Sequence, residues 1–127
     1  MAVRVLIVDD LPFMRAALRR ALDSRDFEIV GEAADGRAGV RRFVALQPDL
    51  VIMDIAMPIM DGLSALSKIV ESDPKARVVM CSAMGEDEMI MEAIRRGARD
   101  FVVKPFQNER VVSVARRVVG MQNGRPL

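Results

Sequence analysis

The sequence predicts an α/β fold: a doubly wound, five-stranded parallel sheet with five helices. Five short apolar runs recur along the 127 residues. Four of these runs are continuous and rich in β-branched residues, as expected of strands buried on both faces of a sheet. Segments with helical periodicity separate the runs. Strands and helices that alternate in this way form a parallel sheet with right-handed crossovers.

The expected strands follow the five apolar runs in order. The second run differs from the others because charged residues interrupt it, which is typical of a strand at the edge of a sheet. The remaining four runs have no such interruption. The expected strands are residues 3–8, 27–32, 50–53, 78–81 and 101–103.

The expected helices carry apolar residues three and four positions apart, with charged residues on the opposite side. Pro12 suits the first turn of the first helix. Asp61 is placed to cap the third helix, and Gly97 is placed to end the fourth. The expected helices are residues 12–22, 36–46, 62–71, 86–96 and 108–120.

Composition indicates one soluble domain. The chain is 51% hydrophobic and 29% charged, which is a globular balance. The net charge of +1 gives no electrostatic footprint for nucleic acid. No run approaches the roughly 20 apolar residues that span a bilayer, so we expect a cytoplasmic protein without membrane contact. We expect residues 1–120 to form the domain and residues 121–127 to be a short polar tail.

The numbers of cysteines and histidines limit the kinds of bond and site that the chain can form. Cys81 is the single cysteine, which rules out an internal disulfide, and its apolar neighbours indicate a buried thiol. The chain has no histidine, so catalytic triads and metal sites that require histidine are excluded.

Polar residues stand at the carboxyl ends of the expected strands, where open parallel sheets bind their ligands. Alone, each is commonly a turn, a helix cap or a loop residue. Together, three carboxylates would repel one another, and a hard divalent cation such as Mg²⁺ relieves that repulsion. A lysine beside them suits an anion, so the sequence predicts a joint site for a metal and an anion. These residues are Asp9, Asp10, Asp54, Ser82 and Lys104.

A carboxylate can act as a nucleophile at phosphorus and form an aspartyl-phosphate. We expect Asp54 to accept the phosphoryl group, with Asp9 and Asp10 holding Mg²⁺ beside it. The three phosphoryl oxygens would each have a partner. The cation would contact the first oxygen, Lys104 the second and Ser82 the third. The chain has no glycine-rich phosphate loop, so the expected donor is a phosphorylated molecule other than ATP.

Four segments resemble the receiver domain of two-component response regulators. They are VLIVDD (5–10), MDIAMPIMDG (53–62), CSA (81–83) and FVVKPF (101–106), all in the usual order and at the usual spacing. The resemblance covers residues 3 to about 120. The segments CSAMG (81–85) and GARDFVVKPFQ (97–107) are most similar to the stand-alone chemotaxis (CheY-like) type. The resemblance implies a flavodoxin-like strand order of 2-1-3-4-5.

The resemblance also implies a role for each site residue. Asp54 would be the phosphoacceptor, and the backbone carbonyl of Ala56 would join the carboxylates of Asp9, Asp10 and Asp54 around Mg²⁺. Ser82 and Phe101 would be the switch residues. Lys104 would pair with the phosphoryl group and precede Pro105 through a cis peptide bond. The chain would catalyse only its own phosphorylation and dephosphorylation.

The implied partners are a sensor histidine kinase (CheA-like), which donates from a phosphohistidine, and a downstream protein such as the flagellar motor switch. Met89, Met91, Val112 and Val119 are candidates for exposed apolar contacts with that target; the alternative is that these four residues only complete helix packing. Ala56 and Met84 lie where many relatives carry polar residues. We hypothesise that they alter autodephosphorylation, in a direction left open.

Three alternatives remain beside the chemotaxis receiver. The chain would be a single-domain receiver in a phosphorelay, or a receiver excised from a larger transcriptional regulator. The third alternative is an Mg²⁺-dependent phosphohydrolase that forms an aspartyl-phosphate. It is disfavoured because residues 8–11 (VDDL) lack an Asp-x-Asp motif and the chain leaves little space for a cap insertion.

Overall fold

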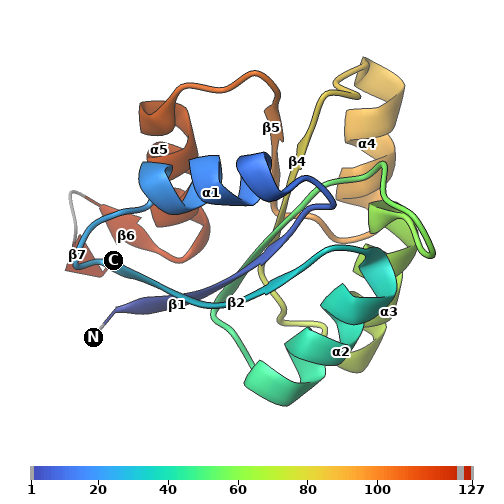
Figure 1. Ribbon diagram of the computed structural model, residues 1–127, viewed down its shortest axis with the longest axis horizontal. Coiled ribbons are helices and arrows are strands. Elements are labelled where there is room, and N and C mark those ends of the chain that lie inside the picture. Colours follow the sequence, from blue (N-terminus) through green and yellow to red (C-terminus); the bar gives the residue numbers. More distant parts are fainter. Residues whose placement is uncertain (1, 123–124, 127) are drawn as a thin grey trace.

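The structure is a computed structural model that describes residues 2–122 and 125–126, with five strands in one parallel sheet. The strand order is β2-β1-β3-β4-β5, and each neighbouring pair is parallel, so the expected topology is confirmed (Figure 1). The strands are β1 (Val3–Val8), β2 (Phe27–Ala33), β3 (Leu50–Met53), β4 (Val78–Ser82) and β5 (Asp100–Val103).

Five helices cover the two faces of this sheet. Figure 1 shows α1 and α5 together on one face and α2, α3 and α4 on the other. The bounds agree with the expected helices to within about two residues; the largest difference is that α5 ends at Val118. The helices are α1 (Pro12–Ala21), α2 (Gly36–Leu46), α3 (Gly62–Ser72), α4 (Asp87–Arg95) and α5 (Asn108–Val118).

The sheet separates two apolar cores. Val5 and Ile7 of β1 pack with residues of α1 and α5, whereas Leu6 and Val8 pack with residues of α2 and α3. Successive side chains of a strand point to opposite faces, so both sets are buried. This is why the apolar runs of the central strands are continuous rather than alternating.

The two capping residues expected from the sequence, Asp61 and Gly97, are confirmed. The Asp61 carboxylate accepts a hydrogen bond from the backbone N–H of Ser64 at 2.8 Å, which caps α3. Gly97 has φ +111°, a conformation that favours glycine. Its N–H donates to the carbonyl of Ile94, and the N–H of Ala98 donates to the carbonyl of Ala93, each at 3.0 Å. This pair of bonds satisfies carbonyls that the end of α4 would otherwise leave free.

The C-terminal segment does not join the main sheet. Met121–Gln122 (β6) and Arg125–Pro126 (β7) form a short antiparallel pair. The other positions of the expected tail, 123–124 and 127, lie outside the described residues. Within residues 2–122 and 125–126, no helix has the length and apolar character needed to cross a membrane.

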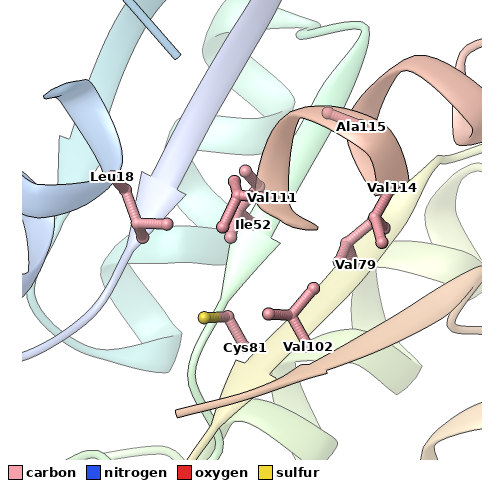
Figure 2. Close-up of a pocket in the computed structure, with 8 residues that line it drawn as sticks. All are labelled: Leu18, Ile52, Val79, Cys81, Val102, Val111, Val114 and Ala115. Carbon is pink, nitrogen blue, oxygen red and sulfur yellow. The ribbon is translucent and has the colours of Figure 1, made fainter. Parts of the chain in front are cut away.

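A small apolar cavity of about 10 Å³ lies between the sheet and α5 (Figure 2). Cys81 of β4, Val102 of β5 and Val114 of α5 are among its lining residues. Burial, helped by the negative charges of Asp54 and Asp9, raises the pKa of the Cys81 thiol to about 12 despite the opposing charge of Lys104. The thiol is therefore neutral at physiological pH, and the buried structural thiol expected from the sequence is confirmed.

Candidate functional site

The polar residues singled out from the sequence gather at one edge of the sheet. Because β1, β3, β4 and β5 are parallel neighbours, the residues that end or follow them lie at the same carboxyl edge. Asp9 and Asp10 follow β1, Asp54 follows β3, Ser82 ends β4 and Lys104 follows β5.

The three carboxylates form one cluster. Asp9, Asp10 and Asp54 each place an oxygen within 4.8 Å of the other two. Asp9 is 1% exposed and Asp54 is 7% exposed, so water screens their charges poorly. Clustered carboxylate oxygens are the donor set that Mg²⁺ prefers. The acidic pocket therefore fits a divalent cation.

Lys104 joins two of these carboxylates. Its Nζ donates to Asp9 Oδ2 at 2.7 Å and to Asp54 Oδ2 at 3.1 Å. Burial alone would lower the pKa of Lys104, but the hydrogen bond to Asp9 and the charges of Asp54 and Asp9 outweigh it and raise the pKa above its usual value. One ammonium faces three carboxylates, so the pocket keeps an excess of negative charge for a cation.

The backbone around Asp54 is held on two sides. Its N–H donates to the carbonyl of Val8 at 2.9 Å, and its Oδ1 accepts from the N–H of Ile55 at 2.7 Å. On the other side lies Gly62, where a Cβ would stand 1.9 Å from the carbonyl oxygen of Asp54. The first turn of α3 therefore packs directly on the backbone that carries Asp54.

Gly62 is a residue whose role sequence reasoning missed, although it lies in the recognised motif. A signal was present: glycine costs about 1 kcal/mol in a helix relative to alanine, yet here it follows the cap residue Asp61 directly. A glycine at such a position indicates that another part of the backbone approaches closely.

Ser82 and Phe101, the two expected switch residues, make their contacts outside the carboxylate cluster. The Ser82 hydroxyl accepts a hydrogen bond from the N–H of Met84 at 3.1 Å, and the Ser82 carbonyl accepts from the N–H of Lys104 at 2.9 Å. Phe101 is 5% exposed and belongs to the same core as Ala93 of α4. The Lys104–Pro105 peptide bond is cis.

Two further residues lie two positions beyond site residues in the sequence. Ala56, after Asp54, is exposed, and Met84, after Ser82, is 36% exposed, so both present apolar groups to the solvent. Ala56 belongs to the loop that follows Asp54, and its backbone carbonyl stays a predicted ligand of the metal.

The surface made by α4, β5 and α5 differs from the one expected. Of the four candidates, Met91 is 58% exposed, whereas Met89, Val112 and Val119 are half-buried against the cores, so these three follow the alternative of helix packing. Ile94 and Val103, each 45% exposed, were missed. Ile94 lies one helical turn beyond Met91, a spacing that could have identified it.

Comparison with known proteins identifies the family to which the chain belongs. Residues 5–116 match the family model of the response regulator receiver domain. The chemotaxis protein CheY of Thermotoga maritima is 48% identical over 118 residues, which are 93% of this chain and 98% of that protein. The chemotaxis protein CheY of Bacillus subtilis is 48% identical over 119 residues, 94% of this chain and 99% of that protein.

A solved structure agrees with these relatives. The crystal structure of the CheX–CheY–BeF₃–Mg²⁺ complex from Borrelia burgdorferi contains a chain similar to this one, with a TM-score of 0.89 and 38% identity. The match covers 91% of this chain and 88% of that chain. With the fold, the edge site and these relatives in agreement, the chain belongs to the response regulator receiver domain family and is a CheY-like member of it.

Proposed function

We propose that Asp54 of this receiver accepts a phosphoryl group from a phosphohistidine on a sensor histidine kinase. The observation that carries the proposal is the position of Lys104 Nζ, within hydrogen-bonding distance of both Asp54 and Asp9 inside a cluster of three carboxylates. A buried acid with an ammonium and a cation-binding set beside it is suited to attack a phosphoryl group and to hold the negative product.

In the proposed reaction an oxygen of Asp54 attacks phosphorus, the P–N bond to the donor imidazole breaks, and the imidazole leaves with the bonding electron pair. Lys104 Nζ pairs with Asp54 at 3.1 Å before the transfer and would then pair with a phosphoryl oxygen. The Ser82 hydroxyl, now bound to the N–H of Met84, would turn to donate to another phosphoryl oxygen.

The cation in this proposal is Mg²⁺, held by Asp9, Asp10, Asp54 and the backbone carbonyl of Ala56. When bound, Mg²⁺ supplies positive charge that offsets the charge of the phosphoryl oxygens. The donor set of three clustered carboxylates supports this choice. In this proposal the chain catalyses only its own phosphorylation and dephosphorylation, as expected of a signalling protein.

We propose that phosphorylation shifts a population of conformers rather than creating a new one. Phe101 lies inside the core in the structure, which supports an inward position as one of the two conformers. A phosphoryl group that draws the Ser82 hydroxyl away from Met84 would favour the inward conformer. The downstream target would recognise this conformer at the apolar surface formed by Met91, Ile94 and Val103.

The downstream target in this proposal is a chemotaxis protein such as the flagellar motor switch, because the relatives from Thermotoga maritima and Bacillus subtilis described above are chemotaxis proteins. A receiver from a larger regulator, or one in a phosphorelay, is the alternative. It is supported by the likeness to the response regulator domain of Thermotoga maritima CheB, with a TM-score of 0.84 and 35% identity over 93% of this chain and 94% of that chain.

The test is phosphorylation by a small donor that contains a P–N bond. We expect the chain, incubated with phosphoramidate and Mg²⁺, to gain the mass of one phosphoryl group, and to gain none when the metal is chelated. Asp54→Asn should remove the gain. Asp61→Asn is the matched control, because asparagine also caps helices and Asp61 is an exposed carboxylate. An unchanged gain in Asp54→Asn would refute the assignment.

A further inference from the structure

Arg15 of α1 connects the ends of two strands. Its Nη1 donates to the backbone carbonyl of Asp9 at 2.6 Å, and its Nε donates to Glu32 Oε1 at 2.8 Å. Asp9 follows β1 and Glu32 lies in β2, so one guanidinium spans both. The side chain is only 18% exposed, which makes these bonds stronger than those of a solvated arginine.

The bond from Arg15 completes the set of hydrogen bonds around Asp9. The N–H of Asp9 donates to the carbonyl of Ala33 at 3.0 Å, and its Oδ1 accepts from the N–H of Leu11 at 3.0 Å. Its Oδ2 accepts from Lys104 at 2.7 Å. With Arg15 on the carbonyl, every polar atom of Asp9 is bonded and its backbone is held in one orientation.

The orientation of this carbonyl matters for Asp10. The carbonyl of Asp9 and the N–H of Asp10 share one planar peptide unit, so a bond to the carbonyl sets the direction in which the chain enters Asp10. Within the described residues, no hydrogen bond holds the Asp10 carboxylate. Its position in the acidic cluster therefore depends on the backbone that Arg15 fixes.

Glu32 holds Arg15 in place. Its second oxygen, Oε2, accepts from Arg19, so two arginines one helical turn apart share this carboxylate. Burial works against the charge of Glu32, but its hydrogen bonds to Arg19 and Arg15 prevail, and the pKa of Glu32 lies below its usual value. An ionised Glu32 and a planar guanidinium form a rigid connection from β2 to the carbonyl of Asp9.

From this geometry we propose that Arg15 is a positioning residue for the cation site. Oriented by Glu32, it fixes the Asp9–Asp10 peptide so that both carboxylates stand ready to bind Mg²⁺. The inference rests on the proposed function, in which Asp9 and Asp10 hold the metal.

Charge and positioning predict opposite effects of removing Arg15. An arginine beside the acidic cluster repels a cation, so if only its charge mattered, Arg15→Ala would bind Mg²⁺ more tightly. If Arg15 positions the ligands, the same substitution weakens binding, because the loosened peptide must be ordered when the metal binds. The sign of the change therefore separates the two roles.

The experiment is a titration of the ¹⁵N-labelled chain with Mg²⁺, followed by the amide signals of residues 9–11 and 54–56. We expect Arg15→Ala to weaken Mg²⁺ binding by about tenfold, in the range found for residues that orient metal ligands. Arg15→Lys keeps the charge but not the two-armed guanidinium, and we expect it to weaken binding by roughly threefold.

Arg19→Ala is the matched control, because Arg19 lies on the same helix and bonds the same Glu32 but forms no bond with Asp9 in the described structure. We expect its Mg²⁺ affinity to stay within about twofold of the original chain. The Asp10 amide signal without metal should shift or broaden in Arg15→Ala and not in Arg19→Ala.

Each result has one consequence. Unchanged or tighter binding by Arg15→Ala, in a chain that itself binds Mg²⁺, overturns the positioning role and leaves the proposed function intact. No binding by the original chain would overturn the proposed function and the inference with it. If Arg15→Ala fails to fold, Arg15→Lys decides alone: binding equal to that of the original chain overturns the inference.

Discussion

The carboxyl edge of the sheet and the interior beneath α5 are stabilised in different ways. At the edge, charged groups are held by directional bonds at short distances, as between Lys104 Nζ and Asp9 Oδ2 at 2.7 Å. Beneath α5, apolar side chains pack with a residual cavity of about 10 Å³ and no polar partner in its lining (Figure 2). The stability of the edge thus depends on the direction of its hydrogen bonds, whereas the stability of the interior depends on the apolar area that it buries.

This difference predicts how each region responds to substitution. A small displacement at the edge breaks a hydrogen bond or moves a metal ligand, so function fails first. A loss of volume in the interior lowers the free energy of unfolding while the edge keeps its geometry, so stability falls and function remains. Phosphorylation and unfolding, measured on the same variants, separate the two regions.

The largest effect is expected at Gly62. A Cβ in Gly62→Ala would stand 1.9 Å from the Asp54 carbonyl oxygen, and since this neighbour is backbone, it cannot rotate away. We expect a loss of about 3 kcal/mol in the free energy of unfolding, together with loss of phosphorylation. Urea unfolding and intact-mass measurements check both.

Gly39→Ala is the control for Gly62. Its Cβ would meet the Val8 side chain at 3.0 Å, and a side chain can adjust where backbone cannot. Alanine also favours the helix, so we expect a change below about 1 kcal/mol. Equal losses of unfolding free energy in the two variants would show that a Cβ next to the Asp54 backbone is no more destabilising than one next to the Val8 side chain.

The next effect is expected in the interior. Val114 is 1% exposed and lines the cavity beneath α5, so Val114→Ala enlarges an existing void. We expect unfolding to become easier by about 2 kcal/mol, with phosphorylation unchanged. Val44→Ala, at a position 56% exposed, serves as the control and should change stability by less than about 0.5 kcal/mol. Loss of phosphorylation in Val114→Ala would contradict the division between the regions.

A third effect concerns pH. The Cys81 thiol has a pKa of about 12 in the folded chain against the ordinary 9.0, so the unfolded chain releases this proton first as pH rises. The neutral thiol makes its full contribution to the free energy of unfolding below pH 9.0. This contribution decreases as the pH rises from 9.0 to about 12. The expected slope is roughly 1.4 kcal/mol per pH unit. Chemical denaturation of the original chain and of Cys81→Ala across this window should diverge; parallel curves would argue against the prediction.

The smallest effect is expected at Ile59, in the loop between Asp54 and α3. Ile59 has φ +69° and is 77% exposed. A β-branched residue therefore adopts a strained left-handed conformation, and no burial of its side chain offsets the strain. Asparagine tolerates this conformation better, and we expect Ile59→Asn to raise the free energy of unfolding by about 0.5–1 kcal/mol. Thermal and urea unfolding measure the change; a destabilised variant would show that the strain has been misjudged.

Much of the fold followed from local patterns in the sequence. Continuous β-branched runs marked the central strands, and the period of the apolar residues marked the helices. The cap at Asp61 and the left-handed Gly97 were also predictable, because each depends on hydrogen bonds within a few residues. The strand order was taken from the family resemblance, since local patterns do not specify which strands are neighbours.

The candidate site was predictable as a set of residues, because the rule for parallel sheets brings the carboxyl ends of strands together. The contacts within the set were not. Lys104 bonds Asp9 across 95 positions of the chain and Asp54 across 50. Which oxygen it meets, and that Gly62 touches the Asp54 backbone, depends on how the helices pack on the sheet.

Exposure on the outer surface was only partly predictable from the sequence. Met91 and Met89 share α4, yet the first is exposed and the second half-buried, since the rotation of a helix is set by what it packs against. The residue pattern thus established the fold, the edge and the acids at that edge through local and periodic information. The bonds from Arg15 to the Asp9 carbonyl and from Lys104 to the Asp9 carboxylate arose only from packing, because they join segments that no local pattern relates.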